Sequence, residues 1–283
     1  MAHEFHIVDV FATERYAGNQ LAVVTGAGDL ADETMQAIAR EFGYSETTFV
    51  EGRDDDGWHV RIFTPAEEIP FAGHPTLGTA WVIREQLATG SPDPVLLHLE
   101  VGDVPVRVED GSLWMTQQAP SFGQEFEREA AAAALGLDPG AVTENLPVQA
   151  VSTGLPTIVV PLRDREALET IEVDRPAYDA LTEGHDAKNL LAYCSDPRDE
   201  AHDYAVRVFA PYYGVPEDPA TGSSNGCLAG YLARHRGGVD AVVEQGYEMG
   251  RPSLLELRAN RVAGDVHVEV GGDVVPVADG TLR

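Results

Sequence analysis

The chain has few of the residues that build disulfide or metal frameworks. Its 283 residues include two cysteines, Cys194 and Cys227, and neither belongs to a CxxC pattern. A disulfide scaffold or a zinc ribbon needs several cysteines at short spacings, so both classes are excluded. None of the nine histidines belongs to an HExxH or HxH cluster, so the sequence contains no signature of a metal cofactor.

Long hydrophobic runs are also missing. The apolar stretches are short and are interrupted by glycine, proline or charged residues, whereas a membrane-spanning helix needs about 20 consecutive apolar residues. The first residues, MAHEFHIVDVF, lack the basic segment followed by an apolar segment that is typical of a secretory signal peptide. We therefore expect a cytoplasmic protein that does not enter a membrane.

Positive charge is scarce. The sequence has 47 acidic and 19 basic residues, a formal net charge of -28, and Lys188 is its only lysine. Nucleic acids and anionic membranes require a positive surface, so neither is expected as a partner. Self-repulsion of this kind destabilises a folded chain unless salt screens it, and the screening length falls to about 3 Å near 1 M salt. We interpret the charge as halophilic adaptation to a salt-filled cytoplasm; ordinary acidic solubility is the alternative.

Strand-like and helix-like segments alternate along the chain, and 43% hydrophobic residues are enough for a full core. Segments such as WHVRIFT, TIVVPL and YAVRVFAP predict strands. Among the helix-like segments, DETMQAIAREFG is predicted to begin at an Asp32 cap and to end at Gly43. The mixture predicts an α+β fold with many hairpin-like strand pairs and few βαβ units.

An internal repeat is the most informative feature of the sequence. The stretch RIFTPAEEIPFAGHPTLGTAWVI, which begins at Arg61, resembles RVFAPYYGVPEDPATGSSNGCLAGYL, which begins at Arg207. The matched pairs are Arg61 with Arg207, Phe63 with Phe209, Pro65 with Pro211, Pro70 with Pro216 and, after an offset change of three residues, Gly73 with Gly222, His74 with Ser223 and Ala80 with Ala229. We therefore predict two related domains of similar plan, joined by a linker within residues 116–126.

Each half of the repeat places a glycine turn before a helix. Backbone N–H groups are unpaired at a helix N-terminus and the helix dipole favours anions there. Two such termini predict a site for a small carboxylated molecule in a cleft between the domains. Glu46, in FGYSETTFV, is a candidate general base, because a carboxylate partly removed from water can act as a base near neutral pH. The alternatives are an exposed strand-edge residue for Glu46, turn residues for His74 and Asp218, and a helix cap for Ser223.

Four stretches together resemble one protein family. They are VDVFATERYAGNQLAVV, YSETTFV, FAGHPTLGTA and DPATGSS, and the resemblance covers essentially the whole chain. The chain resembles the PhzF family of phenazine biosynthesis-like isomerases, which share the diaminopimelate epimerase-like fold. The resemblance implies two pseudo-symmetric domains, each a curved antiparallel sheet wrapped around a central helix: residues 1–118, completed by a C-terminal strand near 273–283, and residues 119–272. It also implies an active site between the domains and, usually, a homodimer.

The resemblance further implies proton transfer without a cofactor or a metal. By matching motifs, Glu46 is the acid/base that moves a proton between carbons of a small carboxylate-bearing substrate. His74 and Asp218 orient the substrate and assist protonation. The residues implied in substrate or carboxylate binding are Gly73, Gly222, Ser223 and Asn19. Asn19 lies in Gly-Asn-Gln, where the family usually reads Gly-Asn-Pro.

Two other functions remain open at this point. Related racemases and epimerases of this fold carry a cysteine at each helix N-terminus, but His74 and Ser223 stand at those positions here. Cys227 lies one helical turn further in, so a two-thiol amino-acid racemase or epimerase is a less favoured alternative. The other is a non-catalytic small-molecule binding protein on the same fold, which the presence of Glu46, His74 and Asp218 disfavours. The sequence does not name the substrate.

Overall fold

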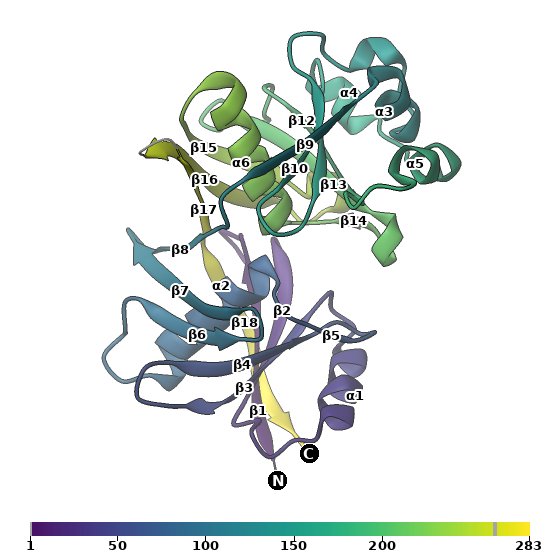
Figure 1. Cartoon of the computed structure of the whole chain (residues 1–283). Coiled ribbons are helices and arrows are strands. Elements are labelled where there is room, and N and C mark those ends of the chain that lie inside the picture. Colours follow the sequence, from purple (N-terminus) through teal and green to yellow (C-terminus); the bar gives the residue numbers. More distant parts are fainter. Residues whose placement is uncertain (1, 263–264) are drawn as a thin grey trace. The chain divides into compact units, whose positions relative to one another are not determined.

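The chain folds into two compact units. The computed structural model of the chain describes residues 2–262 and 265–283, and Figure 1 shows the path of the ribbon. Unit 1 contains Met1–Thr116 and Gly271–Arg283, and unit 2 contains Gln117–Val270. From the sequence, we expected these boundaries after residues 118 and 272. No helix in the part of the chain that the structure describes is long and apolar enough to cross a membrane.

Unit 1 is a set of strands that surround one helix, α2. Its elements are β1 (His3–Val10), β2 (Asn19–Thr25), α1 (Asp32–Phe42), β3 (Thr47–Arg53), β4 (Trp58–Phe63), β5 (Glu68–Ile69), α2 (Gly73–Val82) with a π-helical turn (Ile83–Leu87), β6 (Val95–Leu99), β7 (Gly102–Glu109), β8 (Ser112–Thr116) and β18 (Val274–Leu282). The helix contacts β1, β2, β3, β6, β7, β8 and β18, and every residue of it except Trp81 is buried. Small residues allow this close approach, since a Cβ on Gly78 would lie 2.6 Å from the Leu21 side chain.

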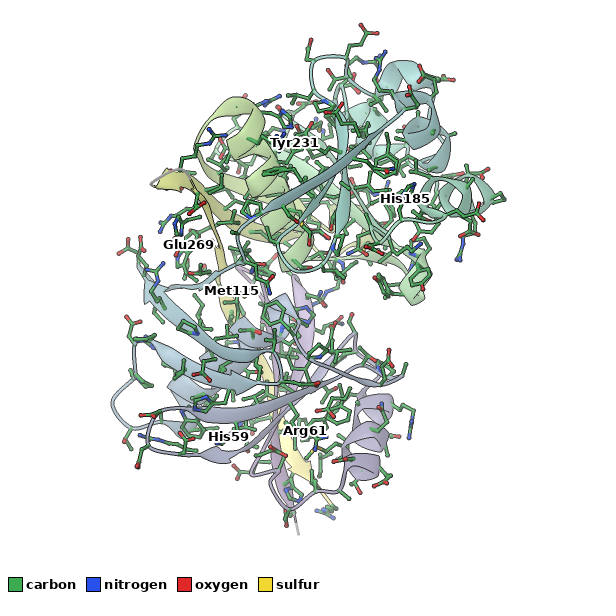
Figure 2. The ribbon with its side chains drawn as sticks, in the orientation of Figure 1. His59, Arg61, Met115, His185, Tyr231 and Glu269 are labelled. Carbon is green, nitrogen blue, oxygen red and sulfur yellow. The ribbon has the colours of Figure 1, made fainter. Side chains whose placement is uncertain are left out.

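Unit 2 repeats this plan around α6 and adds a layer of short helices. Its elements are β9 (Ser121–Phe126), α3 (Arg128–Ala134), β10 (Val148–Ser152), β11 (Thr157–Pro161), α4 (Arg165–Glu169), α5 (Arg175–Thr182), β12 (Asn189–Cys194), β13 (Tyr204–Ala210), β14 (Val215–Asp218), α6 (Gly222–Arg236), β15 (Val239–Gln245) and β16 (Ser253–Val262), with 3-10 turns at Pro139–Ala141, Pro211–Tyr213 and Tyr247–Met249. Strand β17 (Asp265–Gly272) leads back to unit 1. The central helix α6, on which Figure 2 labels Tyr231, contacts β10, β11, β12, β15 and β16. A separate apolar core joins α3, α4 and α5 to strands β10 to β13.

The predicted α+β class is confirmed, but the sheets are mixed rather than wholly antiparallel. Between strands of the described residues, four pairs are parallel: β2 with β3, β4 with β6, β11 with β12, and β13 with β15. Parallel neighbours need a crossover connection, and each of these pairs has helices in its connection: α1, α2, α4 with α5, and α6, respectively. These crossovers were not predicted from the sequence, because the intervening helices are short or contain unusually many small residues.

The internal repeat is visible as two equivalent ion pairs. In unit 1, Arg61 donates through Nε and Nη2 to both oxygens of Glu68, at 2.7 and 2.6 Å, and its guanidinium lies 5.2 Å from the centre of the Phe63 ring. Figure 2 labels Arg61 on β4. In unit 2, Arg207 makes the same paired bonds to Glu217, both at 2.8 Å, and lies 5.0 Å from the Phe209 ring. Planar two-pronged pairing of this kind fixes geometry as well as charge.

The strand register corrects one of the sequence matches. Ile62 pairs with Ile69 across β4 and β5, as Val208 pairs with Asp218 across β13 and β14. The offset of three residues therefore precedes Glu68, so Pro70 corresponds to Pro219 and not to Pro216. The extra length lies in the connection after β13, which contains the 3-10 turn Pro211–Tyr213.

A second correction concerns the start of α1. Asp32 was expected to be its cap, but the N-cap is Ala31 and Asp32 lies in the first turn, where its carboxylate accepts a hydrogen bond from Arg61. The predicted end is confirmed: Gly43 adopts the left-handed conformation, with φ of 67°, and its N–H donates to the Ala39 carbonyl.

Candidate functional site

His74 lies at the N-terminus of α2, as its second residue. The helix begins at Gly73, its N-cap Ala72 provides no side-chain cap, and its first turn contains no acidic residue. The first N–H groups of a helix have no partner within the helix, so this end attracts an anion. His74 itself is 5% exposed, which shows that it is more than a surface turn residue.

His74 meets Glu46 at this helix end. Its Nε2 lies 3.5 Å from Glu46 Oε2, and the Glu46 side chain is 18% exposed. Glu46 lies in the turn directly before β3, so it is neither within a strand nor freely exposed. Burial lowers the pKa of His74 to about 3, against the smaller opposing effect of a hydrogen bond to the Gln20 backbone. The imidazole is therefore neutral at physiological pH.

The turn that contains Asn19 lies against the same helix end. Asn19 is the first residue of β2 and is 1% exposed, and Gln20 supplies the backbone group that bonds to His74. Gly18 makes the turn possible: its φ is 65°, and a Cβ there would lie 2.3 Å from the Val10 carbonyl oxygen. Unit 1 thus brings together Glu46, His74 and the Asn19–Gln20 backbone.

Unit 2 carries the second group of predicted residues. Asp218 ends β14, and the Thr221 hydroxyl donates a short hydrogen bond to Asp218 Oδ2. Gly222 and Ser223 are the first two residues of α6, and Thr221 is the N-cap, so Ser223 is not the cap that one alternative suggested. The Ser223 carbonyl accepts a hydrogen bond from Thr153 Oγ1 at 3.5 Å.

Two buried amides that the sequence did not single out hold this turn. Gln245, at the end of β15, and Asn225, in the first turns of α6, are 1% and 0% exposed. Both bond to Thr221, and Gln245 also bonds to Asp218. The sequence of β15, VDAVVEQ, gives no local signal that distinguishes Gln245 from the neighbouring polar residue Glu244.

Both thiols are buried within unit 2, and neither stands at the start of a helix. Cys227 is fully buried in α6 and donates to the Leu155 carbonyl at 3.5 Å, and burial raises its pKa. Burial also raises the pKa of Cys194, to about 11. A thiol must ionise easily to act as a nucleophile or base, so neither residue is suited to two-thiol chemistry.

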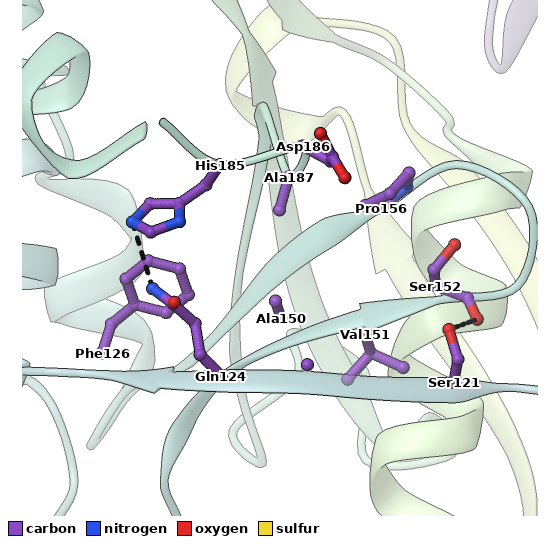
Figure 3. A pocket seen from close by; sticks show the side chains of 11 residues that line it. Ser121, Gln124, Phe126, Ala150, Val151, Ser152, Pro156, His185, Asp186 and Ala187 are labelled. Carbon is purple, nitrogen blue, oxygen red and sulfur yellow. Dashed lines mark hydrogen bonds between the residues drawn. The ribbon is translucent and has the colours of Figure 1, made fainter. Parts of the chain in front are cut away.

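A separate small hollow of about 230 Å³ lies in unit 2 and contains none of the predicted site residues (Figure 3). Its floor is the β9–β10 pair, one end is closed by a 3.1 Å contact between Gln124 Nε2 and His185 Nε2, and Ser121 bonds to the Ser152 carbonyl at the other. Among residues 2–262 and 265–283, no three histidine, cysteine or acidic side chains are grouped so that they could hold a metal ion.

The structure therefore groups the predicted residues into two sets, one in each unit. Glu46, His74, Gly73 and Asn19 belong to unit 1, and Asp218, Gly222 and Ser223 belong to unit 2. Their roles, and the expectation that they share one cleft, stay predictions.

Comparison with known proteins identifies relatives over the full length. A family model described as phenazine biosynthesis-like protein (PhzC-PhzF) matches residues 8–280. A trans-2,3-dihydro-3-hydroxyanthranilate isomerase of Pseudomonas aeruginosa is 38% identical, over 98% of this chain and 98% of the relative. An uncharacterized isomerase of Mesorhizobium japonicum is 36% identical, over 98% and 97%.

Solved structures give the same result. A PhzF-family phenazine biosynthesis protein of Bacillus anthracis superimposes with a TM-score of 0.93 and 25% identity, over 100% of this chain and 99% of that one. A probable proline racemase of Agrobacterium radiobacter superimposes with a TM-score of 0.63 at 10% identity, over 99% and 93%, which shows a shared fold alone. The PhzF-family and racemase structures thus confirm the predicted fold, and the full-length relatives confirm the predicted family.

Proposed function

The chain belongs to the phenazine biosynthesis-like family and is an isomerase, and we propose that Glu46 moves a proton between carbons of a small carboxylated substrate. The observation that carries the proposal is the 3.5 Å approach of Glu46 to a buried, neutral His74. A mostly buried carboxyl beside a neutral imidazole, at a helix end that favours anions, is suited to acid–base work on an anionic molecule.

Moving a proton between carbons requires one group that takes the proton and returns it. In the proposed reaction the Glu46 carboxylate takes a proton from one substrate carbon. The electron pair left behind is delocalised over adjoining double bonds and the substrate carboxylate, and protonated Glu46 then gives the proton to a second carbon. Substrate and product have the same composition, and Glu46 is again a carboxylate when the reaction is complete.

His74 assists as a neutral group. Nε2 of His74 is buried and makes no hydrogen bond within the described residues, so the bond to the Gln20 carbonyl comes from the other ring nitrogen, which must carry the hydrogen. In this tautomer Nε2 is an acceptor that faces Glu46 Oε2. It can therefore hold the proton of protonated Glu46 in place between its uptake and its return.

Binding of the substrate carboxylate is proposed for the two helix ends. Gly73 offers a backbone N–H donor at the start of α2. Gly222 offers a backbone N–H, and Ser223 a hydroxyl donor, at the start of α6. Asp218 and Asn19 are proposed to orient polar substituents of the substrate. Because the relative from Pseudomonas aeruginosa is named for a dihydro-hydroxyanthranilate, a partly reduced, hydroxylated cyclic carboxylate is the proposed substrate class.

Solvent isotope exchange tests the proposal. The protein is incubated with trans-2,3-dihydro-3-hydroxyanthranilate in D2O, and deuterium at ring carbons is followed by proton NMR. We expect product formation with deuterium incorporation, and a loss of about 10²- to 10⁴-fold in rate for Glu46→Gln, since one acid–base group contributes this much. Unchanged circular dichroism confirms that the variant folds. Full activity in Glu46→Gln would contradict the proposed role.

The non-catalytic alternative gives a different result. A binding protein would show tight ligand binding that Glu46→Gln leaves unchanged, and no deuterium exchange with either form. The two-thiol racemase is disfavoured by the burial of Cys194 and Cys227.

Three further properties are proposed on the sequence and on family resemblance. The net charge of -28 supports a protein adapted to a salt-filled cytoplasm, with neither nucleic acid nor membrane as a partner. The proposed partner is a small carboxylated molecule, for which the two helix N-termini and the family resemblance are the support. Family resemblance supports a homodimer, which light scattering at molar KCl tests directly. The reaction is proposed to need no metal or organic cofactor, so exhaustive dialysis against a chelator should leave the rate unchanged.

A further inference from the structure

One buried amide bonds to both ends of the turn that carries Asp218. We infer that Gln245 is a positioning residue, which fixes the turn from Asp218 to Thr221 and thereby sets the orientation of the Asp218 carboxylate. The inference rests on the proposed function, in which Asp218 orients the substrate. Gln245 is 1% exposed and lies 27 residues along the chain from Asp218, so β15 brings it there through the fold.

Each end of the Gln245 amide bonds to two groups of suitable polarity. Its Oε1 accepts from the Thr221 backbone N–H at 3.2 Å and from Asn225 Nδ2 at 2.8 Å. Its Nε2 donates to the Asp218 carbonyl at 2.8 Å and lies 3.1 Å from Thr221 Oγ1. Asn225 Nδ2 also donates to the Thr221 carbonyl at 3.0 Å, which ties the turn to the first turns of α6.

The side-chain bonds have one possible direction. An amide NH2 group can only donate, so Thr221 Oγ1 accepts from Gln245 Nε2 and uses its own hydrogen for Asp218 Oδ2. The chain of bonds therefore runs from amide to hydroxyl to carboxylate. It gives Oδ2 of Asp218 a donor whose own position is fixed by Gln245.

Unit 1 contains the same strand, turn and helix with different residues. In β4 and β6, Trp58 pairs with Leu97, as Tyr204 pairs with Val243 across β13 and β15. Two residues further along β6 and β15 lie Leu99 and Gln245. Leu99, which is 8% exposed, therefore occupies the place of Gln245 in unit 1.

The rest of the polar set is replaced too. By the register given above, the residues of unit 1 that correspond to Asp218, Thr221 and Asn225 are Ile69, Ala72 and Thr76. Thr76 Oγ1 still donates to the Ala72 carbonyl at 2.7 Å, which reproduces the side-chain bond from Asn225 to the Thr221 carbonyl. The turn thus forms without Gln245, Thr221 or Asp218. The polar set of unit 2 is therefore not needed to build the turn, and holding Asp218 is what it adds.

Three variants test the inference. Gln245→Leu introduces the residue that unit 1 uses, Asp218→Asn removes the carboxylate, and the double variant combines them. We expect Gln245→Leu to lower kcat/KM about 10- to 100-fold, as expected for displacement of an orienting group by about 1 Å. We expect the double variant to lose no more than Asp218→Asn alone, because Gln245 acts through Asp218. Additive losses would overturn the inference.

Gln149→Leu is the matched control. Gln149 is a second buried glutamine of unit 2, 4% exposed, that bonds to the Gly123 carbonyl and to His235 near the far end of α6. It should lose stability as Gln245→Leu does, but keep its kcat/KM. A Gln245→Leu variant within twofold of wild type, or no less active than Gln149→Leu, would count against the assignment.

A crystal structure of Gln245→Leu gives an answer that does not depend on turnover. The expected result is a Thr221 hydroxyl turned away from Asp218 and a rotated Asp218 carboxylate, with α6 unmoved. An Asp218 side chain in its original place overturns the inference, whatever the activity. If instead Glu46→Gln is fully active while Asp218 rotates in Gln245→Leu, the proposed function fails and the positioning of Asp218 by Gln245 stands.

Discussion

Nε2 of His74 lies 3.5 Å from Oε2 of Glu46, although 28 residue positions separate them and three strands lie between them in sequence. The contact joins the turn before β3 to the start of α2. It places a mostly buried carboxyl beside an imidazole that burial keeps neutral. The pair is therefore defined by the packing of α2 inside its sheet.

His74 should make the protein less stable as the pH falls. Its folded pKa of about 3 lies below the ordinary value of 6.5, so the unfolded chain binds the extra proton first. The contribution of neutral His74 to the free energy of unfolding is complete above pH 6.5 and is lost as the pH falls toward 3. Relative to His74→Gln, the wild-type unfolding free energy should decrease by about 2–3 kcal/mol between pH 7.5 and 4.5. Urea titrations at the two pH values measure this, and parallel curves would contradict the neutral buried imidazole.

Gly18→Ala should be more damaging than Gly26→Ala. Both glycines have a positive φ, 65° and 64°, but a Cβ on Gly18 would lie 2.3 Å from the Val10 carbonyl oxygen, whereas nothing lies within 4 Å of one on Gly26. Gly26→Ala measures the backbone strain alone, about 1–2 kcal/mol. Gly18→Ala should cost more in thermal unfolding and also lower activity, since it displaces Asn19 and Gln20. Equal effects would show that the turn relaxes at no further cost.

Salt should stabilise the protein by screening its charge. With a net charge of -28, raising KCl from 0.1 to 2 M should increase the melting temperature, by roughly 2–4 °C for each kcal/mol of repulsion that is screened. Sucrose of equal osmolality is the control, because it favours compact states without screening charge. If sucrose raises the melting temperature as much as KCl does, the interpretation as ordinary acidic solubility gains support.

Much of the fold could be predicted because both halves of the repeat contain short sequence patterns that are typical of strands, turns and helix starts. Glycine turns before helices that are rich in small residues identified the starts of α2 and α6, and strand-like segments identified most of the strands. Pro216 was matched to Pro70 because prolines in neighbouring turns look alike in the sequence. The true offset follows from the strand register, in which Ile69 pairs with Ile62 as Asp218 pairs with Val208. Asp32 was mistaken for a cap because its attraction to Arg61 depends on a strand 29 residues away.

In the candidate site, too, residues in local sequence motifs could be predicted, whereas residues placed by tertiary packing could not. His74 and Ser223 lie in recognisable motifs, and Glu46 is near enough to a strand pattern to be noticed. Gln245 lies in no motif, because its role depends on which strand is adjacent to β13. That adjacency comes from the parallel crossover of α6, which no local pattern encodes.

The return of the chain to unit 1 has a consequence for its synthesis. Strand β1 pairs with β18 along its whole length, from His3 with Leu282 to Val10 with Val274. Unit 2, by contrast, is one uninterrupted segment. During translation, the part of the protein that is made first must wait for its last strand, while the part made second already has all of its residues. The half that carries Glu46 is therefore the half whose sheet is completed last.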